Sequence, residues 1–336
     1  MQPPAALTRY RRALDDHLRS LVDRPEPRDL YRMLRYHLGW EDAEGRPTQS
    51  TGKRLRPVLC LLACEAAGGE AERALPFASA VELVHNFSLV HDDVQDGDRL
   101  RHGRDTVWAV WGEPQAINAG DALLALARLS LTEVTETSVI AASRLLDERT
   151  LEMVEGQVMD IAFEGETDVS LDAYLAMISR KTGALFDASL ALGALAAGAS
   201  AEIVAALGRC GRQLGLAFQV RDDMLGIWGD VDRTGKPVAA DIRRHKKSLP
   251  IVFALERTEG DELERLQRVY GAGEPSAGDV SFVVGLLDSL GAQAYCQDEA
   301  DGYRTAALSE LAAADLDESA AGEMREVTDF LLERDF

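Results

Sequence analysis

Helical periodicity runs through almost the whole chain, and it restricts the possible folds more than any other feature. Apolar residues recur every three or four positions, as expected for helices with one buried face. Pro57 opens one such helix, which Gly68 and Gly69 end. Alternating strand-like runs are scarce, and we find no hairpin turn. The helical segments are 6–23, 28–38, 57–67, 73–96, 115–134, 140–163, 170–198 and 201–228, with more helices from 249 onward.

The chain shows no linker or repeat that would divide it. Polar, glycine-containing stretches at 41–53, 229–247 and 271–278 interrupt the helices without a change in composition. We therefore predict one all-α domain over residues 1–336, an enlarged bundle of about ten or more helices.

The composition argues against several classes of protein. The 336 residues include 57 acidic and 36 basic side chains, a net charge of −21, and such a surface repels the phosphates of nucleic acids. The N-terminus lacks the apolar segment of a signal peptide. The most apolar run, 182–200, contains Asp187 and is rich in small residues, so we expect a buried helix rather than a transmembrane segment. We expect a cytoplasmic protein whose four cysteines are small core residues.

Two pairs of aspartates interrupt apolar helices. Asp92 and Asp96 are four residues apart and share a helix face, with Asp93 beside them. The pair Asp222-Asp223 lies 130 residues further on, one turn after Gln219. Like charges at helical spacing repel, and hard oxygen ligands suit Mg²⁺ bridged to a substrate phosphate. Each cluster alone could be a solvated acidic face, but two on apolar helices favour a metal-assisted diphosphate site across a central cavity.

The few cations are concentrated near these clusters. Lys53, Arg54 and Arg56 precede a helix start, an arrangement that favours anion binding. Each of these groups of cations, taken alone, could be a solvated surface. The sequence contains no P-loop motif. The loop 229–241 has the glycines of a mobile flap that would exclude water. Further cations are Arg99, Arg101, His102, Arg104, Arg180, Lys181, Lys236 and 243–247.

The motifs of this sequence, in their order along the chain, resemble those of the trans-isoprenyl diphosphate synthases, also called polyprenyl synthetases. Within that family the resemblance is strongest to members similar to geranylgeranyl diphosphate synthases. Nine segments between residues 52 and 250 carry the resemblance. They are GKRLRP, HNFSLVHDDVQD, RHG, AINAGDALLALA, GQVMD, KTGALF, FQVRDD, GKP and DIRRHKKSLP.

The resemblance implies a prenyltransferase that joins an allylic diphosphate head to tail with isopentenyl diphosphate. It implies that Asp92, Asp96 and Asp222 hold Mg²⁺, and that Thr182 acts near the departing diphosphate. The allylic diphosphate would be held by Arg101, Lys181, Gln219, Lys236 and Lys246, and isopentenyl diphosphate by Lys53, Arg56, His85 and the position of His102. The resemblance also suggests a homodimer.

Four positions depart from the family pattern. His102 replaces an arginine, Asp105 replaces a proline, Gly226 replaces the last aspartate of the second motif, and Ser248 replaces a threonine. A neutral imidazole is a weaker diphosphate ligand than a guanidinium, so we expect Arg104 to compensate.

The apolar helix before Asp92 predicts the product length. Each turn of about 5.4 Å corresponds to roughly one isoprene unit, so Ser88, Phe87 and Val84 lie where a growing chain would end. Small Ser88 with aromatic Phe87 resembles the geranylgeranyl (C20) pattern; Phe87 could instead only pack the core. Farnesyl (C15) or longer products, a class I terpene cyclase and a non-catalytic subunit of a heteromeric synthase remain alternatives.

Overall fold

The computed structural model describes residues 4–48, 52, 54–134, 138–229, 239–271 and 273–332. Of the described residues, 78% are helical, which confirms the all-α prediction. The first half contains α1 (Ala6–Arg9), α2 (Arg11–Val22), α3 (Arg28–His37), α4 (Leu55–Ala66), α5 (Ala71–Gln95), α6 (Val107–Trp111), α7 (Glu113–Leu131) and α8 (Ser138–Glu164). The second half contains α9 (Leu171–Ile178), η1 (Ser179–Gly183), α10 (Ala184–Ala197), α11 (Ala201–Trp228), α13 (Ala240–Arg243), α14 (Leu249–Arg257), α15 (Gly260–Gly271), α16 (Ala277–Ser289), α17 (Ala292–Ala313) and α18 (Glu318–Leu332).

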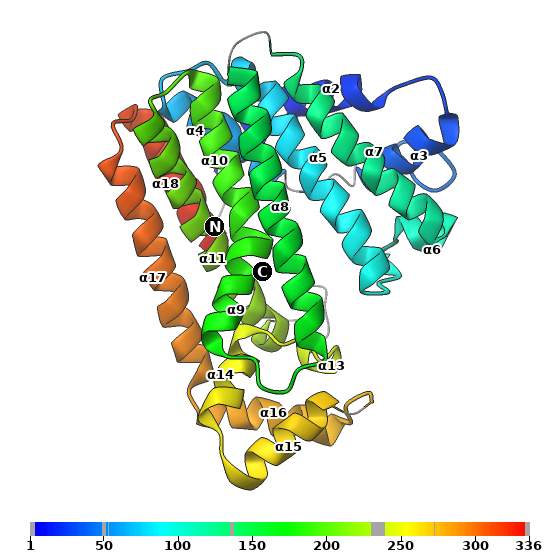
Figure 1. Cartoon of the computed structure of the whole chain (residues 1–336), viewed down its shortest axis with the longest axis vertical. Coiled ribbons are helices and arrows are strands. Elements are labelled where there is room, and N and C mark those ends of the chain that lie inside the picture. The colour runs from blue at the N-terminus through cyan, green and yellow to red at the C-terminus, as the bar shows by residue number, and fades with distance from the viewer. Residues whose placement is uncertain are drawn as a thin grey trace.

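The centre of the bundle is α10, which packs against α4, α5, α8 and α11. Apart from Asp187 and Ser189 its sequence is apolar or small on every face, and nearly all its residues are buried, as expected for a helix surrounded by others. Figure 1 shows α5, α8 and α10 along the length of the molecule, with α14, α15 and α16 at one end. No helix within the described ranges is both long and apolar enough to cross a membrane.

The segment predicted as one helix over 170–198 contains a change of helix type. Residues Ser179–Gly183 form a π-helical turn, η1, between α9 and α10. Such turns widen a helix locally and are frequent at functional sites. This one contains Lys181 and Thr182, which the sequence pattern had singled out.

One hairpin was missed by the sequence analysis. Strand β1 (Leu100–Arg101) pairs with β2 (Arg104–Asp105) in an antiparallel register that aligns Arg101 with Arg104. The two turn residues, His102 and Gly103, both have positive φ, 51° and 73°, as type I′ hairpins require. The prediction of no hairpin was wrong because these strands are too short to show an alternating pattern.

The start of α4 also differs from the prediction. The helix begins at Leu55 rather than at Pro57, after Arg54 in the left-handed region. Pro57 is tolerated there because the first turn of a helix has no internal partners for its N–H groups. Arg56 therefore lies within the first turn, facing the interior of the bundle.

Candidate active site

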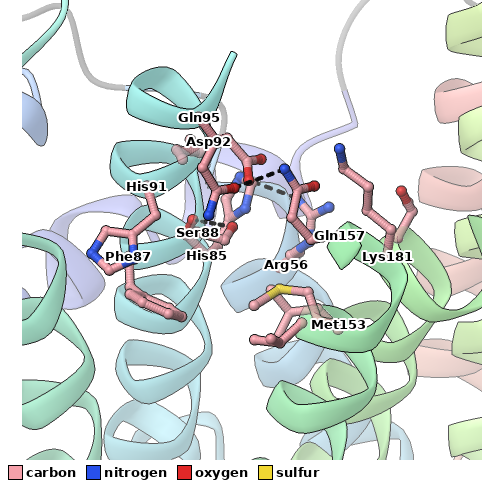
Figure 2. Close-up of a pocket in the computed structure, with 14 residues that line it drawn as sticks. Arg56, His85, Phe87, Ser88, His91, Asp92, Gln95, Met153, Gln157 and Lys181 are labelled. Atoms are coloured by element: carbon pink, nitrogen blue, oxygen red, sulfur yellow. Dashed lines mark hydrogen bonds between the residues drawn. The ribbon is translucent and has the colours of Figure 1, made fainter. Parts of the chain in front are cut away.

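A cavity of about 270 Å³ lies between α5 and α8, against α4 and η1. Figure 2 shows Asp92 and Gln157 towards one end and Phe87 and Met153 further along the two helices. Polar and charged groups thus gather at one end, and apolar side chains lie at the other. Its lining residues are Arg56, His85, Phe87, Ser88, Leu89, His91, Asp92, Gln95, Met153, Val154, Gln157, Lys181, Thr182 and Leu185.

The first aspartate pair is divided between the cavity and the protein. Asp92 lines the cavity, whereas Asp93 is only 2% exposed and accepts a hydrogen bond from Nε of Arg101 at 2.7 Å. Burial raises the pKa of Asp92 to about 6, against the opposing charge of Lys181. Asp96 lies one turn later with an exposed side chain, and partial desolvation of its carboxylate still raises its pKa. Desolvation is the main cause of both shifts, and a bound cation would favour the charged form of each carboxylate.

A cationic group forms the cavity wall next to α4. Arg56 donates from a guanidinium nitrogen to Nε2 of His85 at 3.2 Å, and its Cζ lies 4.7 Å from the centre of the Phe186 ring. Burial and the charge of Arg56 lower the pKa of His85 well below its usual value, so His85 is neutral. Burial lowers the pKa of Arg56 to about 10. An anion bound here would be held by a guanidinium that stacks on an aromatic ring.

The opposite wall is built around η1. Lys181 forms an ion pair with Asp160, with Nζ and Oδ2 2.5 Å apart. A Cβ at Gly156 would lie 2.3 Å from the backbone nitrogen of Lys181, so only glycine lets α8 approach η1 this closely. Gln157, the next residue, donates to Oε1 of Gln95 across the cavity at 2.9 Å.

A hydrogen-bonded chain leads from this wall to the second aspartate pair. Thr182 donates to Oε1 of Gln219 at 2.8 Å, and Gln219 donates to Oδ1 of Asp223 at 3.0 Å. Asp223 is fully buried and also accepts the Tyr174 hydroxyl and, at 3.0 Å, the backbone N–H of Leu249. Asp222, by contrast, is exposed.

Several residues predicted for the site lie outside the cavity lining. Lys246 places Nζ 3.6 Å from Asp223 Oδ1, Arg101 contacts Asp93, and His102 is on the exposed hairpin turn. Val84 is fully buried in the core and does not line the cavity. Asp96, Asp222 and Gln219 also lie outside the lining. Lys53 and Lys236 fall outside the described residues.

Arg104 was expected to replace the diphosphate-binding arginine that is missing at position 102, but its partners are different. It donates to the backbone oxygens of Tyr36 and Glu41 at 3.1 and 3.0 Å, and its guanidinium lies over the Tyr36 ring. These contacts attach the hairpin to α3. The structure therefore gives Arg104 a role in packing and does not support the expected compensation.

The sequence analysis missed the cavity residues contributed by α8. Met153, Val154 and Gln157 line the cavity, and Asp160 pairs with Lys181. Gln157 and Asp160 belong to the GQVMD segment that carries part of the resemblance. Because this segment is polar at helical spacing, it was not distinguishable from a surface helix.

The donor set fits Mg²⁺ shared with a diphosphate. The candidate ligands Asp92, Asp96 and Asp222 offer carboxylate oxygens, which Mg²⁺ prefers, and buried Oδ2 of Asp93 has no hydrogen-bond partner in the described part of the chain. Among the described residues, no three acidic, histidine or cysteine side chains lie close enough to hold an ion alone. Mg²⁺ usually completes its shell with substrate phosphates and water, so this arrangement suits it.

Comparisons with known proteins identify relatives along the whole chain. The family model described as "Polyprenyl synthetase" matches residues 44–287. A (2E,6E)-farnesyl diphosphate synthase of Mycobacterium tuberculosis is 42% identical over 322 residues, 94% of this chain and 89% of the relative. A geranylgeranyl diphosphate synthase of the same organism is 44% identical over 296 residues, 87% and 84% of the two chains. The crystal structure of a polyprenyl synthetase from Streptomyces coelicolor A3(2) superposes with a TM-score of 0.92 at 40% identity, covering 98% and 99%.

Proposed function

We propose that this chain, which belongs to the polyprenyl synthetase family and is a prenyltransferase, makes all-trans geranylgeranyl diphosphate (C20) with Mg²⁺. The substrates would be an allylic diphosphate and isopentenyl diphosphate. One observation carries the proposal: a single cavity has Asp92, Arg56 and Lys181 at its polar end and Phe87 with Met153 at its apolar end. Such a cavity suits a molecule with a diphosphate head and a hydrocarbon tail. We further propose that residues 1–336 act as one catalytic domain.

The proposed reaction begins with departure of the allylic diphosphate. Lys181 and Thr182 would stabilise the negative charge that grows as the bond between C1 and oxygen breaks. Mg²⁺, held by Asp92, Asp96 and Asp222, would add charge neutralisation at the same diphosphate. The remaining contacts to this diphosphate would come from Arg101, Gln219, Lys236 and Lys246.

The second substrate would be held on the opposite wall. Arg56, with His85 and Lys53, would bind the diphosphate of isopentenyl diphosphate, and the position of His102 would lie near it. The double bond of isopentenyl diphosphate would attack the allylic cation, and the released diphosphate would take the proton. The apolar walls would exclude water, which would otherwise convert the cation to an alcohol.

The proposed product length rests on the side chains at the apolar end of the cavity. Phe87 is 8% exposed and lines the cavity five residues before Asp92, while Ser88 leaves space one turn before Asp92. Val84, fully buried, lies in the core below Phe87. This arrangement supports a C20 product over a C15 product, because Ser88 places no aromatic ring near the diphosphate end.

The test is a condensation assay with purified protein, Mg²⁺, isopentenyl diphosphate and each allylic primer in turn. We expect diphosphate release only when both substrates are present, and a C20 product by chromatography after phosphatase treatment. Release from the allylic substrate alone would indicate a cyclase, and no release would indicate a non-catalytic subunit. A C15 or longer product would retain the activity and refute the chain length. Chelation of Mg²⁺ should abolish turnover, and turnover that persists would refute the cofactor.

We also propose that the chain forms a homodimer through α7 and α8. Large apolar side chains are exposed along α8 at helical spacing: Leu151 (61%), Val154 (41%), Val158 (62%) and Ile161 (42%). Ile117 (46%) and Leu129 (43%) are also exposed, on α7. A stripe of this kind favours a protein partner. Light scattering should give twice the mass of 36.6 kDa, and Val158→Asp should give a monomer, with Glu148→Lys as an exposed control outside the stripe. A monomeric wild-type protein would refute this proposal.

A further inference from the structure

Gly226 leaves a notch in α11 that another carboxylate fills. A Cβ at this position would lie 2.1 Å from Oδ2 and 2.5 Å from Cγ of Asp241, distances that no real pair of atoms adopts without displacement. Gly226 lies in a helix interior, where glycine costs about 1 kcal/mol relative to alanine. The close approach of Asp241 gives a physical reason for glycine at this position. It follows Asp222 by four residues, so both lie on one face of the helix.

Asp241 is attached to Lys246 by two contacts. The backbone N–H of Lys246 donates to the backbone oxygen of Asp241 at 2.9 Å, and Nζ lies 3.8 Å from Oδ2. The same Nζ lies 3.6 Å from Oδ1 of Asp223. Lys246 is therefore held between two carboxylates, while 38% of its side chain stays exposed.

Tyr270 on α15 lies near Asp241, and its ring is next to that of His245. The Tyr270 hydroxyl is buried, and neither it nor Nε2 of His245 has a hydrogen-bond partner among the described residues. The two rings are 5.8 Å apart. Burial and then the charge of Asp241 raise the pKa of Tyr270, so its hydroxyl stays protonated near this carboxylate. His245 adopts a φ of 55°, which turns the chain between α13 and Lys246.

We infer that Asp241 is a positioning residue: its carboxylate, seated in the notch at Gly226, fixes Lys246 where it binds the diphosphate. The acid missing from position 226 is thereby supplied from α13. A side chain at 226 would displace Asp241, even where that side chain is itself an aspartate. The identity of the bound anion rests on the proposed function, but the geometry of the notch does not.

The test is isothermal titration calorimetry of the full chain with inorganic pyrophosphate in excess Mg²⁺. Asp241→Asn adds no heavy atoms and removes the charge, and we expect about a tenfold weaker Kd, typical of losing a charge-assisted contact. Gly226→Ala and Gly226→Asp should weaken binding by a similar factor. Gly302→Ala is the matched control, because Gly302 is an exposed helical glycine with no atom within 4 Å of a Cβ, and its Kd should not change.

A double-mutant cycle separates positioning from general structural support. If Asp241 acts through Lys246, Asp241→Asn in a Lys246→Ala background should cause no further loss of affinity. Additive losses would overturn the inference, and so would a wild-type Kd for Asp241→Asn. The Asp241→Asn result remains decisive if circular dichroism shows that Gly226→Ala is unfolded. A wild-type chain that binds magnesium pyrophosphate but does not condense its substrates refutes the proposed function alone; failure to bind pyrophosphate at all refutes both.

Discussion

Phe87→Ala should lengthen the product by about one isoprene unit. Phe87 lies five residues before Asp92, about 7.5 Å along α5 at 1.5 Å per residue. The next apolar side chains on this face, Leu83 and Val84, lie one turn further, and both are fully buried. Removing the ring therefore opens roughly 5.4 Å, the length of one more turn and close to one unit. We expect C25 to replace C20, with Met153 still limiting growth from α8.

The variant also carries a stability cost that must be separated from its effect on length. A buried Phe→Ala change costs about 3–5 kcal/mol, and we expect the lower end because the ring already faces a cavity. Phe163→Ala is the matched control, since Phe163 has the same 8% exposure but packs in a different cluster around α9 and α11. Products are compared by chromatography below the melting temperature of both variants. Unchanged products in an active Phe87→Ala enzyme, or longer products in Phe163→Ala, would refute the reasoning.

Three further predictions concern the acidic side chains. Burial raises the pKa of Asp92 to about 6, so the deprotonated fraction of this carboxyl decreases when the pH is lowered through 6. The Mg²⁺ concentration for half-maximal turnover should therefore rise as the pH decreases through 6. A flat profile would refute the role of Asp92. Asp222→Ala should abolish turnover with an unchanged melting temperature. Asp223→Ala should instead lower the free energy of unfolding by about 3 kcal/mol, because it leaves the Tyr174 hydroxyl without its buried partner. Calorimetry and turnover assays distinguish the two effects, and the reverse pattern would contradict the assignment. Asp187→Asn should cost about 3–5 kcal/mol in urea unfolding, since Asp187 pairs with two arginines in the core; a cost under 1 kcal/mol would contradict this.

The sequence predicted the helices well because their burial pattern is regular. Both ends of the helix over 201–228 were predicted correctly, since Ser200 caps the start of α11 and Gly229 follows its end. The long segment over 170–198 was placed too, but its π-helical turn was not. A single wider turn changes the direction of Lys181 and Thr182 without changing the period of the flanking residues.

The cavity could be predicted only on one side. Asp92 and Phe87 were identified because both lie on one helix, where sequence spacing gives distance directly. Met153 and Gln157 belong to the opposite wall, and their distance from α5 depends on how closely α8 approaches. That approach is set by Gly156 against Lys181, a contact between segments whose pairing the sequence alone does not reveal.

Each aspartate doublet contributes one ligand candidate and one structural acid. Neighbouring residues on a helix point about 100° apart, so a doublet cannot direct both carboxylates at one ligand. In the first pair, Asp93 is buried against Arg101 while Asp92 faces the cavity; in the second, Asp223 is buried against Tyr174 while Asp222 is exposed. The inner acid fixes the rotation of its helix and thereby aims the outer acid. Removing an inner acid should therefore misdirect its neighbour, which gives each doublet a physical reason to contain two aspartates although only one of them is a candidate metal ligand.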